Sequence, residues 1–285
     1  MTIGEIFRQT YINLKDAQVD QPHLEAGWII EKYAHIDSAE RIKNADKEIE
    51  TTAIQFIEEA IARRKTGEPL AYIFEECEFY SYPFYVNKNV LIPRPETEQL
   101  VDWALKWVES NKAQKQIEIL DLGTGSGCLG LTLIKEIPTA RLTAVDISKE
   151  ALSVARRNAE LLKVSNRVEF INLDAARAEH LMNQFDLIVA NPPYIAKEDA
   201  TVELNVRKFE PNMALFSKDN GLFDIQSWLK ASSSLLKEKS AIGFEIGSQQ
   251  GEPVLKLFRD LNIFSQQYGL KDYAGHARFV CGEIN

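Results

Sequence analysis

Apolar side chains recur every three to four residues through the first third of the chain. Two stretches show this spacing most clearly, one from Ile3 to Leu14 and one from Ile54 to Ile61. The spacing places apolar residues on one face of an amphipathic helix. Gly67 follows three basic residues, which is typical of the end of a helix. We therefore expect a small helical domain over residues 1–70.

The pattern changes after residue 70. Aromatic and β-branched residues dominate EFYSYPFYVNKNVLI, in which Pro83 and an Asn-Lys-Asn run are turn signals. This pattern predicts a pair of strands, and we expect a β-hairpin linker over residues 71–93. The following segment, PETEQLVDWALKWVES, has proline at its start, acidic residues in its first turn and apolar residues along one side. This helix opens a second domain, expected over residues 94–285.

Strand-like and helical segments alternate through the second domain. The expected strands are 117–122, 141–145, 168–173, 185–190 and 241–246. Segments with helical spacing follow them, at 127–136, 149–163, 222–236 and 251–260. Such alternation predicts an α/β fold, in which a doubly wound, Rossmann-like parallel sheet is covered by helices on both faces.

The composition is that of an ordinary globular protein, with 45% apolar and 26% charged residues. No apolar run is long enough to span a bilayer, and the first residues lack the apolar core of a secretory signal. Cys77, Cys128 and Cys281 are far apart, and the histidines show no metal-ligand spacing. We expect a cytoplasmic protein with reduced thiols, no metal and no membrane contact.

The charge balance bears on the choice of partner. The formal net charge is −9, and residues 1–89 contain 10 Lys and Arg against 16 Asp and Glu. An acidic surface repels phosphate backbones. We therefore expect no direct binding of nucleic acid.

A glycine-rich loop follows the first expected strand of the second domain and opens a helix. Its residues are Asp121, Leu122, Gly123, Thr124, Gly125, Ser126 and Gly127. The glycines allow the backbone to turn sharply and to approach a ligand closely. Nineteen residues beyond Gly127, the next strand ends in Asp146, whose carboxylate suits the two hydroxyls of an adenosine ribose. The loop and the acid together predict a nucleoside cofactor.

The loop alone does not identify that cofactor. Gly125, Gly127 and Gly130 also satisfy the GxGxxG pattern of dinucleotide-binding proteins. Asp121 favours S-adenosylmethionine, because a carboxylate attracts the ammonium of its methionine part and repels a pyrophosphate. A dehydrogenase and a tight turn without ligand stay open as alternatives on this pattern alone.

A second motif, Asn191-Pro192-Pro193-Tyr194, follows the apolar run FDLIVA directly. Two prolines end a strand and fix the backbone, so the side chain of Asn191 and the carbonyl of Pro192 are held in one orientation. Two fixed acceptors match the two N–H donors of a planar NH2 group. Tyr194 is placed to stack on the flat face of that group. The motif predicts methyl transfer to an amide or amino nitrogen.

With these motifs in place, the chain resembles the release-factor glutamine methyltransferases of the PrmC/HemK type, which are class I S-adenosylmethionine-dependent enzymes. The resemblance covers nearly the whole length. Besides DLGTGSG and NPPY it includes GEPLAYI, EFYSYPFYVNKNVLIPRPETEQLV, FEPNMALFSKDNGL, EIGSQQG and DYAGHARFV. One departure stands out: where the family usually has a glycine soon after the Tyr-Ile of GEPLAYI, this chain has Phe74-Glu75-Glu76-Cys77.

The resemblance implies a role for each motif. It implies that the helical domain helps to hold a peptide-chain release factor and that the enzyme methylates the side-chain nitrogen of the glutamine in a GGQ tripeptide. Gly123 to Gly127 would surround the methionine part of the cofactor, and Asp146 would bind its ribose. Asp174 and Ala175 would lie near adenine. Residues Asn191 to Tyr194 would hold the glutamine, with Asn191 also beside the cofactor, and we expect a monomer.

Three alternatives share some of these features. A glutamine methyltransferase of a ribosomal protein has both central motifs and differs in its substrate. An adenine or cytosine amino methyltransferase of nucleic acids would flip its target base, but the acidic first third disfavours it. A non-enzymatic dinucleotide-binding or adaptor module would leave Asn-Pro-Pro-Tyr without a role.

Overall fold

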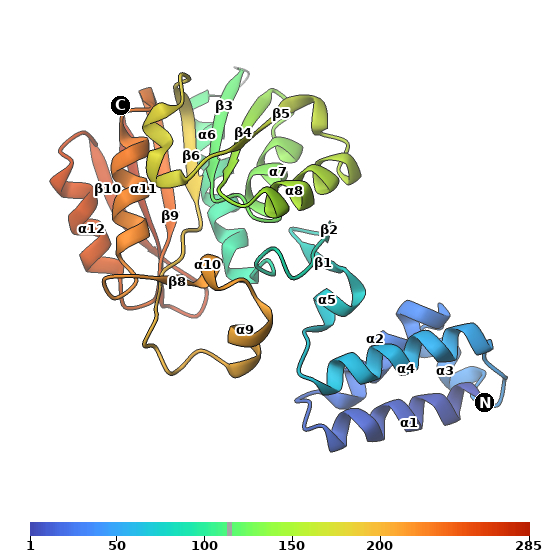
Figure 1. Cartoon of the computed structure of the whole chain (residues 1–285). Coiled ribbons are helices and arrows are strands. Elements are labelled where there is room, and N and C mark those ends of the chain that lie inside the picture. The colour runs from blue at the N-terminus through green and yellow to red at the C-terminus, as the bar shows by residue number, and fades with distance from the viewer. Residues whose placement is uncertain (113–115) are drawn as a thin grey trace. The chain divides into compact units, whose positions relative to one another are not determined.

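The computed structural model describes residues 1–112 and 116–285. The described residues form two compact units, Met1–Glu75 and Glu76–Asn285 (Figure 1). The hairpin that follows the helical unit belongs to the second of them. Within the described ranges, no helix is both long and apolar enough to cross a membrane.

The first unit is entirely helical, as its apolar spacing predicts. Its helices are α1 (Ile3–Asp16), α2 (Pro22–Ala34), α3 (Ser38–Lys43), α4 (Thr51–Lys65) and α5 (Leu70–Phe74). Helix α1 begins with a capping box between Thr2 and Glu5, which satisfies two backbone N–H groups. Helices α1, α2 and α4 bury isoleucine and leucine side chains against one another. The burial of these apolar faces is the main stabilising term of the unit.

Helix α5 ends where the sequence departs from the family pattern. Glu75 caps it in the left-handed conformation, with φ 55° and ψ 29°, and its N–H donates to the carbonyl of Ala71. Glycine adopts this conformation without steric cost, whereas a residue with a Cβ is strained there. The segment in which this chain lacks the family glycine therefore contains a position, Glu75, whose backbone favours glycine.

The second unit opens with the expected hairpin. Strands β1 (Glu76–Phe79) and β2 (Tyr82–Tyr85) pair antiparallel, and a 3-10 turn, η1 (Pro95–Thr97), leads into α6 (Glu98–Lys112). Phe79 and Phe84 from the two strands meet edge to face and join the core beside α6. The apolar alternation of the segment thus buries one face of the hairpin.

A seven-stranded sheet forms the centre of this unit, in the order β10-β11-β9-β6-β3-β4-β5. The strands are β3 (Ile117–Leu122), β4 (Ala140–Asp146), β5 (Val168–Asn172), β6 (Phe185–Ala190), β9 (Leu236–Glu245), β10 (Gln266–Lys271) and β11 (Ala277–Ile284). The five from β9 to β5 are parallel to one another, as expected, whereas β11 is antiparallel to both of its neighbours. The sheet is therefore mixed. Alternation with helices predicts only parallel strands, and β10 and β11 are instead joined by a short turn.

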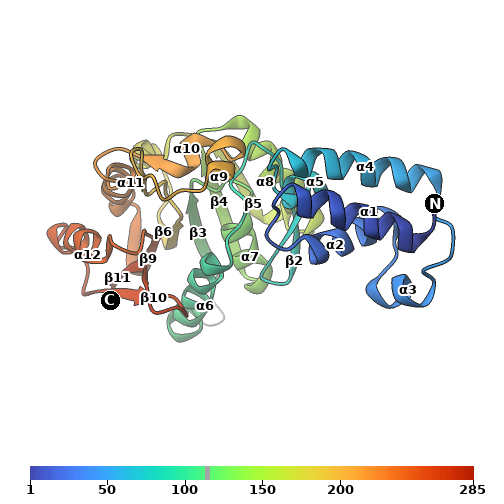
Figure 2. The same cartoon turned by 90° about the horizontal axis from the view of Figure 1, so that it is seen from below.

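Helices cover both faces of the sheet, which confirms the doubly wound arrangement (Figure 2). Helix α6 packs with α7 (Cys128–Glu136) and the C-terminal end of α8 (Lys149–Leu161) on one face. Helices α11 (Phe223–Ser233) and α12 (Gly251–Asp260) cover the other face together with the 3-10 segment η3 (Ala175–His180). A further 3-10 turn, η2 (Ser165–Arg167), precedes β5.

The order of the strands brings the sequence motifs to one edge. Strand β3 lies between β4 and β6, with Leu122 in register with Val145 and Ala190. The glycine loop follows β3, Asp146 is the last residue of β4, and Asn191 follows β6. Beyond β6 come short elements that were not expected from the sequence: β7 (Ile195–Ala196), α9 (Leu204–Phe209), α10 (Asn212–Leu215) and β8 (Phe216–Ser217).

Candidate active site

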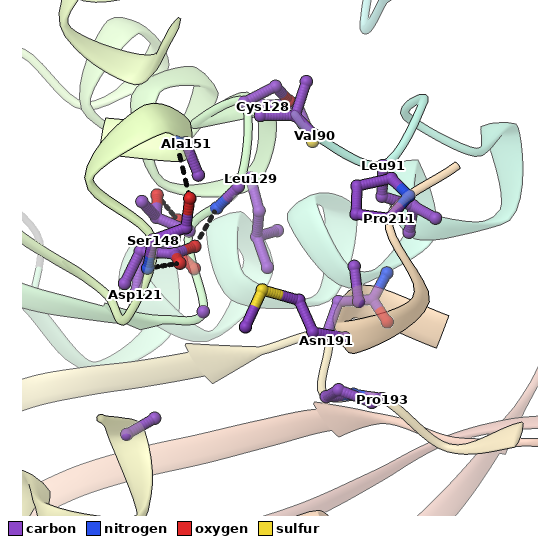
Figure 3. Close-up of a pocket in the computed structure, with 18 of the residues that line it drawn as sticks. Val90, Leu91, Asp121, Cys128, Leu129, Ser148, Ala151, Asn191, Pro193 and Pro211 are labelled. Atoms are coloured by element: carbon purple, nitrogen blue, oxygen red, sulfur yellow. Dashed lines mark hydrogen bonds between the residues drawn. The ribbon is translucent and has the colours of Figure 1, made fainter. Parts of the chain in front are cut away.

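A first cavity opens at the carboxyl ends of the central strands. The loops after β3, β4 and β6 line it, together with residues from the segments 89–97 and 211–214. In the close-up, Asp121 and Ser148 lie at one side of the cavity, and Asn191 and Pro193 lie at the other (Figure 3). The cavity thus joins the two motifs that the sequence singled out. Its position is that of a ligand site in an open α/β sheet.

The glycine loop depends on left-handed backbone at three positions. Gly123, Gly125 and Gly127 have φ values of 68°, 56° and 82°. A Cβ on Gly123 would approach the ring of Trp228 to 2.5 Å. The N–H of Thr124 donates to the carbonyl of Val145 at 2.9 Å and ties the loop to β4. The four loop residues from Gly123 to Ser126 line the cavity. Gly127, which caps the start of α7, does not.

Asp121 is a buried carboxyl group at the start of the loop, with 2% of its surface exposed. Its Oδ2 accepts hydrogen bonds from the Thr124 hydroxyl at 2.6 Å and from the Gly130 N–H at 3.1 Å. Burial raises the pKa of Asp121 to about 6, although both hydrogen bonds act in the opposite direction. A Cβ on Gly130 would lie 2.8 Å from the same oxygen. Gly130 therefore allows α7 to pack against a carboxylate, an arrangement that disfavours a pyrophosphate.

Asp146 ends β4 and faces the loop. Its Oδ2 accepts a hydrogen bond from the N–H of Gly125, and its Oδ1 accepts one from the N–H of Ser148, both at 2.9 Å. Burial raises the pKa of Asp146, and these two hydrogen bonds lower it. Each carboxylate oxygen has a second lone pair. The side chain can therefore hold the loop and accept from a ribose hydroxyl at the same time.

Asp174 and Ala175 also line the cavity, at the start of η3. The Oδ1 of Asp174 accepts from the N–H of Ala176 at 2.9 Å, so this acid caps a turn as well. The cavity presents the carboxylates of Asp121 and Asp146 beside the backbone of the glycine loop, groups that fit the hydroxyls and the ammonium of S-adenosylmethionine. In the described part of the chain, no group of three or more His, Cys, Asp and Glu side chains is arranged to hold a metal ion.

Asn191 lines both this first cavity and a second one. Both cavities are lined by Leu91, Arg94, Asn191 and Ala214, so they adjoin. The Nδ2 of Asn191 donates to the hydroxyl of Thr97 at 3.4 Å. Pro192 and Pro193 are buried, and of these two Pro193 lines the first cavity.

Tyr194 lines the second cavity and not the first. Its hydroxyl donates to Oε1 of Glu245 at 3.2 Å, and its carbonyl accepts from Nε2 of Gln250 at 2.9 Å. Burial and the nearby charge of Glu245 raise the pKa of Tyr194. The expected stacking of the Tyr194 ring on the target amide stays a prediction. The hydrogen bond to Glu245 fixes the hydroxyl end of that ring.

Four residues that the sequence analysis did not single out complete the site. They are Arg94, Thr97, Glu210 and Glu245. Glu210 is buried and accepts from Arg94 at 2.6 Å and from the N–H of Ile92 at 3.2 Å, which holds the segment that both cavities share. Glu245 accepts from the Thr97 hydroxyl at 2.6 Å. A sequence signal existed for Glu245, because an acid within the apolar run AIGFEI must find buried partners.

Comparison with known families agrees with this arrangement. Residues 102–236 match the model of the methyltransferase small domain, and residues 5–74 match the model of the PrmC N-terminal domain. The two matches fall on opposite sides of the boundary between the compact units.

Individual relatives extend the comparison over the whole chain. The release factor glutamine methyltransferase of Koribacter versatilis is 37% identical, over 99% of this chain and 98% of its own. That of Vibrio cholerae is 36% identical, over 99% and 97%. Among solved structures, the catalytic domain of hMettl16 superposes with a TM-score of 0.56 at 12% identity, over 85% of this chain and 86% of its own. This last likeness concerns the fold alone.

Proposed function

Because the chain belongs to the family of release factor glutamine methyltransferases, we propose that it methylates the side-chain amide nitrogen of the glutamine in the GGQ motif of peptide-chain release factors. The methyl donor is S-adenosylmethionine. The observation that carries this proposal is the position of Asn191, which lines both the first cavity and the adjoining second one. A donor in the first cavity and an amide in the second would meet at this residue.

The first cavity holds the cofactor in this proposal. The loop from Gly123 to Ser126 surrounds the methionine part, and Asp121 balances its ammonium. Asp146 accepts from the ribose hydroxyls, and Asp174 and Ala175 flank the adenine. Asn191 borders the sulfonium end, where the two cavities adjoin. The bound cofactor supplies an electrophilic methyl group on a sulfonium.

The protein's part in the chemistry is orientation. The lone pair of an amide nitrogen is delocalised into the carbonyl, so alignment matters more than a strong base. The Oδ1 of Asn191 and the carbonyl of Pro192 accept the two N–H groups of the glutamine and turn its nitrogen toward the first cavity. Pro193 fixes the backbone behind them, and Tyr194 borders the glutamine side chain. Acceptors fixed in advance favour the charge that develops on the nitrogen during transfer.

We also propose roles for the domains, a cellular location, an oligomeric state and the absence of nucleic-acid binding. Residues 1–70 contribute to holding the release factor, residues 71–93 link the domains, and residues 94–285 carry out catalysis. The protein acts as a cytoplasmic monomer and binds no nucleic acid directly. Its net charge of −9 supports a protein substrate over a polyphosphate one.

Mass spectrometry of purified substrates tests the proposal. We expect incubation with S-adenosylmethionine to add 14 Da, about the mass of one CH2 unit, to the GGQ peptide of an intact release factor. Methylation of a ribosomal protein, or of adenine or cytosine in nucleic acid, would assign the chain to one of the alternatives. A release factor in which the glutamine is replaced by alanine is the matched control and should stay unmodified.

A further inference from the structure

The hydroxyl group of Thr97 lies between two side chains of the site. It donates to Oε2 of Glu245 at 2.6 Å and accepts from Nδ2 of Asn191 at 3.4 Å. A hydroxyl has one hydrogen, so donation to Glu245 leaves Thr97 only an acceptor to offer to Asn191. The NH2 end of the Asn191 carboxamide must then face Thr97. The opposite orientation would bring two acceptor oxygens together.

We propose that Glu245 is a positioning residue which, through Thr97, fixes the end of the Asn191 carboxamide that faces the substrate. The inference rests on the proposed function, because its consequence depends on the target being an amide NH2 group. With the NH2 of Asn191 turned toward Thr97, the oxygen of the same carboxamide is free to face the cavities. That oxygen is the acceptor that an NH2 substrate requires.

The chemistry of Glu245 makes it suited to this role. Its side chain is 1% exposed, and each of its oxygens accepts from a hydroxyl, Oε2 from Thr97 and Oε1 from Tyr194. An ionised carboxylate only accepts hydrogen bonds, so the Thr97 hydrogen has a single direction. Burial raises the pKa of Glu245, whereas the hydrogen bonds from Thr97 and Tyr194 and the positive charge of Arg278 lower it.

Of the three hydrogen bonds that link Tyr194, Glu245, Thr97 and Asn191, the one between Thr97 and Asn191 is the longest. Its direction is the one that a substitution of Glu245 can reverse. A glutamine in place of Glu245 has one oxygen and one NH2 group to offer to Thr97 and Tyr194, so the direction of the Thr97 hydrogen is no longer fixed. When the NH2 group faces Thr97, the Thr97 hydrogen is free to donate to Oδ1 of Asn191, and the carboxamide can turn over. Asn191 would present a donor to the donors of the substrate, which is unfavourable in a desolvated site.

Kinetics of matched variants test the inference. We expect Thr97→Val and Glu245→Gln to lower kcat on an intact release factor by about tenfold or more, with affinity for S-adenosylmethionine changed by less than about twofold. Thr97→Ser keeps the hydroxyl and should restore most of the turnover lost in Thr97→Val. Thr132→Val removes a buried hydroxyl of α7 that has no hydrogen-bond partner among the described residues, so it serves as the control.

A second measurement tests directly which end of the Asn191 carboxamide faces the substrate. A release factor with GGE in place of GGQ carries a carboxylate, which lacks the N–H donors that the Asn191 oxygen accepts. The wild-type enzyme should bind the GGQ form better than the GGE competitor, and Glu245→Gln should reduce this preference by about fivefold or more. A role of Glu245 in packing alone would not change the preference.

The possible failures are distinguishable. If wild-type enzyme modifies the release factor while Thr97→Val retains full kcat, the inference is wrong and the proposed function stands. Equal losses in Thr97→Ser and Thr97→Val, or an unchanged preference for GGQ over GGE in Glu245→Gln, overturn it as well. If Glu245→Gln does not fold, the two Thr97 variants decide. A wild-type enzyme that leaves the release factor unmodified overturns both the function and the inference.

Discussion

The carboxylate of Asp146 holds the backbone of Gly125, because its Oδ2 accepts a hydrogen bond from the Gly125 N–H at 2.9 Å. The last residue of β4 therefore sets the position of the loop that follows β3. In the proposed function the same carboxylate also binds the cofactor ribose. Loss of this side chain should affect the cofactor in two ways, by removing direct hydrogen bonds and by releasing the loop.

Asp146→Ala should therefore weaken binding of S-adenosylmethionine. Charge-assisted hydrogen bonds contribute more than neutral ones, and we expect a loss of about 1.5 to 3 kcal/mol. Isothermal titration calorimetry measures it. Asp146→Asn, which keeps one acceptor oxygen, should show a smaller loss. Unchanged affinity in a folded Asp146→Ala variant would contradict the assignment.

Asp121 should make cofactor binding depend on pH. Burial raises the pKa of Asp121 to about 6, so the carboxyl is largely neutral at pH 5 and ionised at pH 7. Only the ionised form attracts the ammonium of the cofactor. Affinity for S-adenosylmethionine should rise between pH 5 and pH 7, as measured by calorimetry. Asp121→Asn should flatten this rise, and a rise of equal size in that variant would exclude Asp121 as its source.

The same group should lower the stability of the folded protein as pH increases. Because its pKa is raised on folding, its contribution is fully present below the ordinary carboxyl pKa of about 4 and is lost as pH rises through about 6. Both hydrogen bonds reach Oδ2, so Asn can retain them. The wild type should lose up to about 3 kcal/mol relative to Asp121→Asn between pH 4 and pH 7. Urea unfolding at the two pH values measures the difference.

The parts of the site that could be predicted from the sequence are local ones. The loop from Asp121 to Gly127 lies between a strand and a helix, and a parallel sheet places it beside Asp146 and Asn191 whatever the order of the outer strands. The partners of Tyr194 and Thr97 could not be predicted in this way. Thr97 and Glu245 are 148 positions apart, and their contact depends on how α6 packs against β9.

The pairing of β10 and β11 at one edge of the sheet also could not be predicted from local sequence patterns. Strands β10 and β11 are joined by a turn in which the N–H of Asp272 donates to the carbonyl of His276. A short turn makes the two strands antiparallel. The position of β11 between β9 and β10 is set by side-chain packing across the sheet, since Phe279 and Val280 enter the cores on opposite faces.

Glu75→Gly should stabilise the protein. Glu75 has φ 55° at the end of α5, where glycine has no steric cost. Relief of this strain exceeds the added freedom of glycine in the unfolded chain, and we expect a gain of about 0.5 to 1 kcal/mol. Chemical denaturation measures it. Glu76→Gly lies in β1, where glycine is unfavourable, and serves as the control; a loss of stability in both variants would contradict the prediction.

Thr132→Val should also stabilise the protein. Thr132 is fully buried in α7, and its hydroxyl has no hydrogen-bond partner among the described residues. Valine has nearly the same shape and no polar group, so we expect a gain of about 1 kcal/mol in the free energy of unfolding. Thr10, another buried helical threonine, donates to the carbonyl of Ile6 at 2.7 Å, so Thr10→Val should not give this gain.

Asn191→Ala tests the centre of the proposed mechanism. Asn191 lies where the two cavities adjoin, and its oxygen is proposed to accept an N–H of the target glutamine. This acceptor acts on the reacting amide, whereas most cofactor contacts come from the loops after β3 and β4. Removing it should lower the single-turnover rate on a release factor by roughly a hundredfold or more, with little change in cofactor affinity. Rapid-quench methylation with a radiolabelled methyl group measures the rate, and calorimetry measures the affinity. Thr132→Val, which changes a buried side chain outside both cavities, controls for altered packing. A wild-type single-turnover rate in Asn191→Ala would show that the amide is held by other groups, even if the fold and the cofactor are as described.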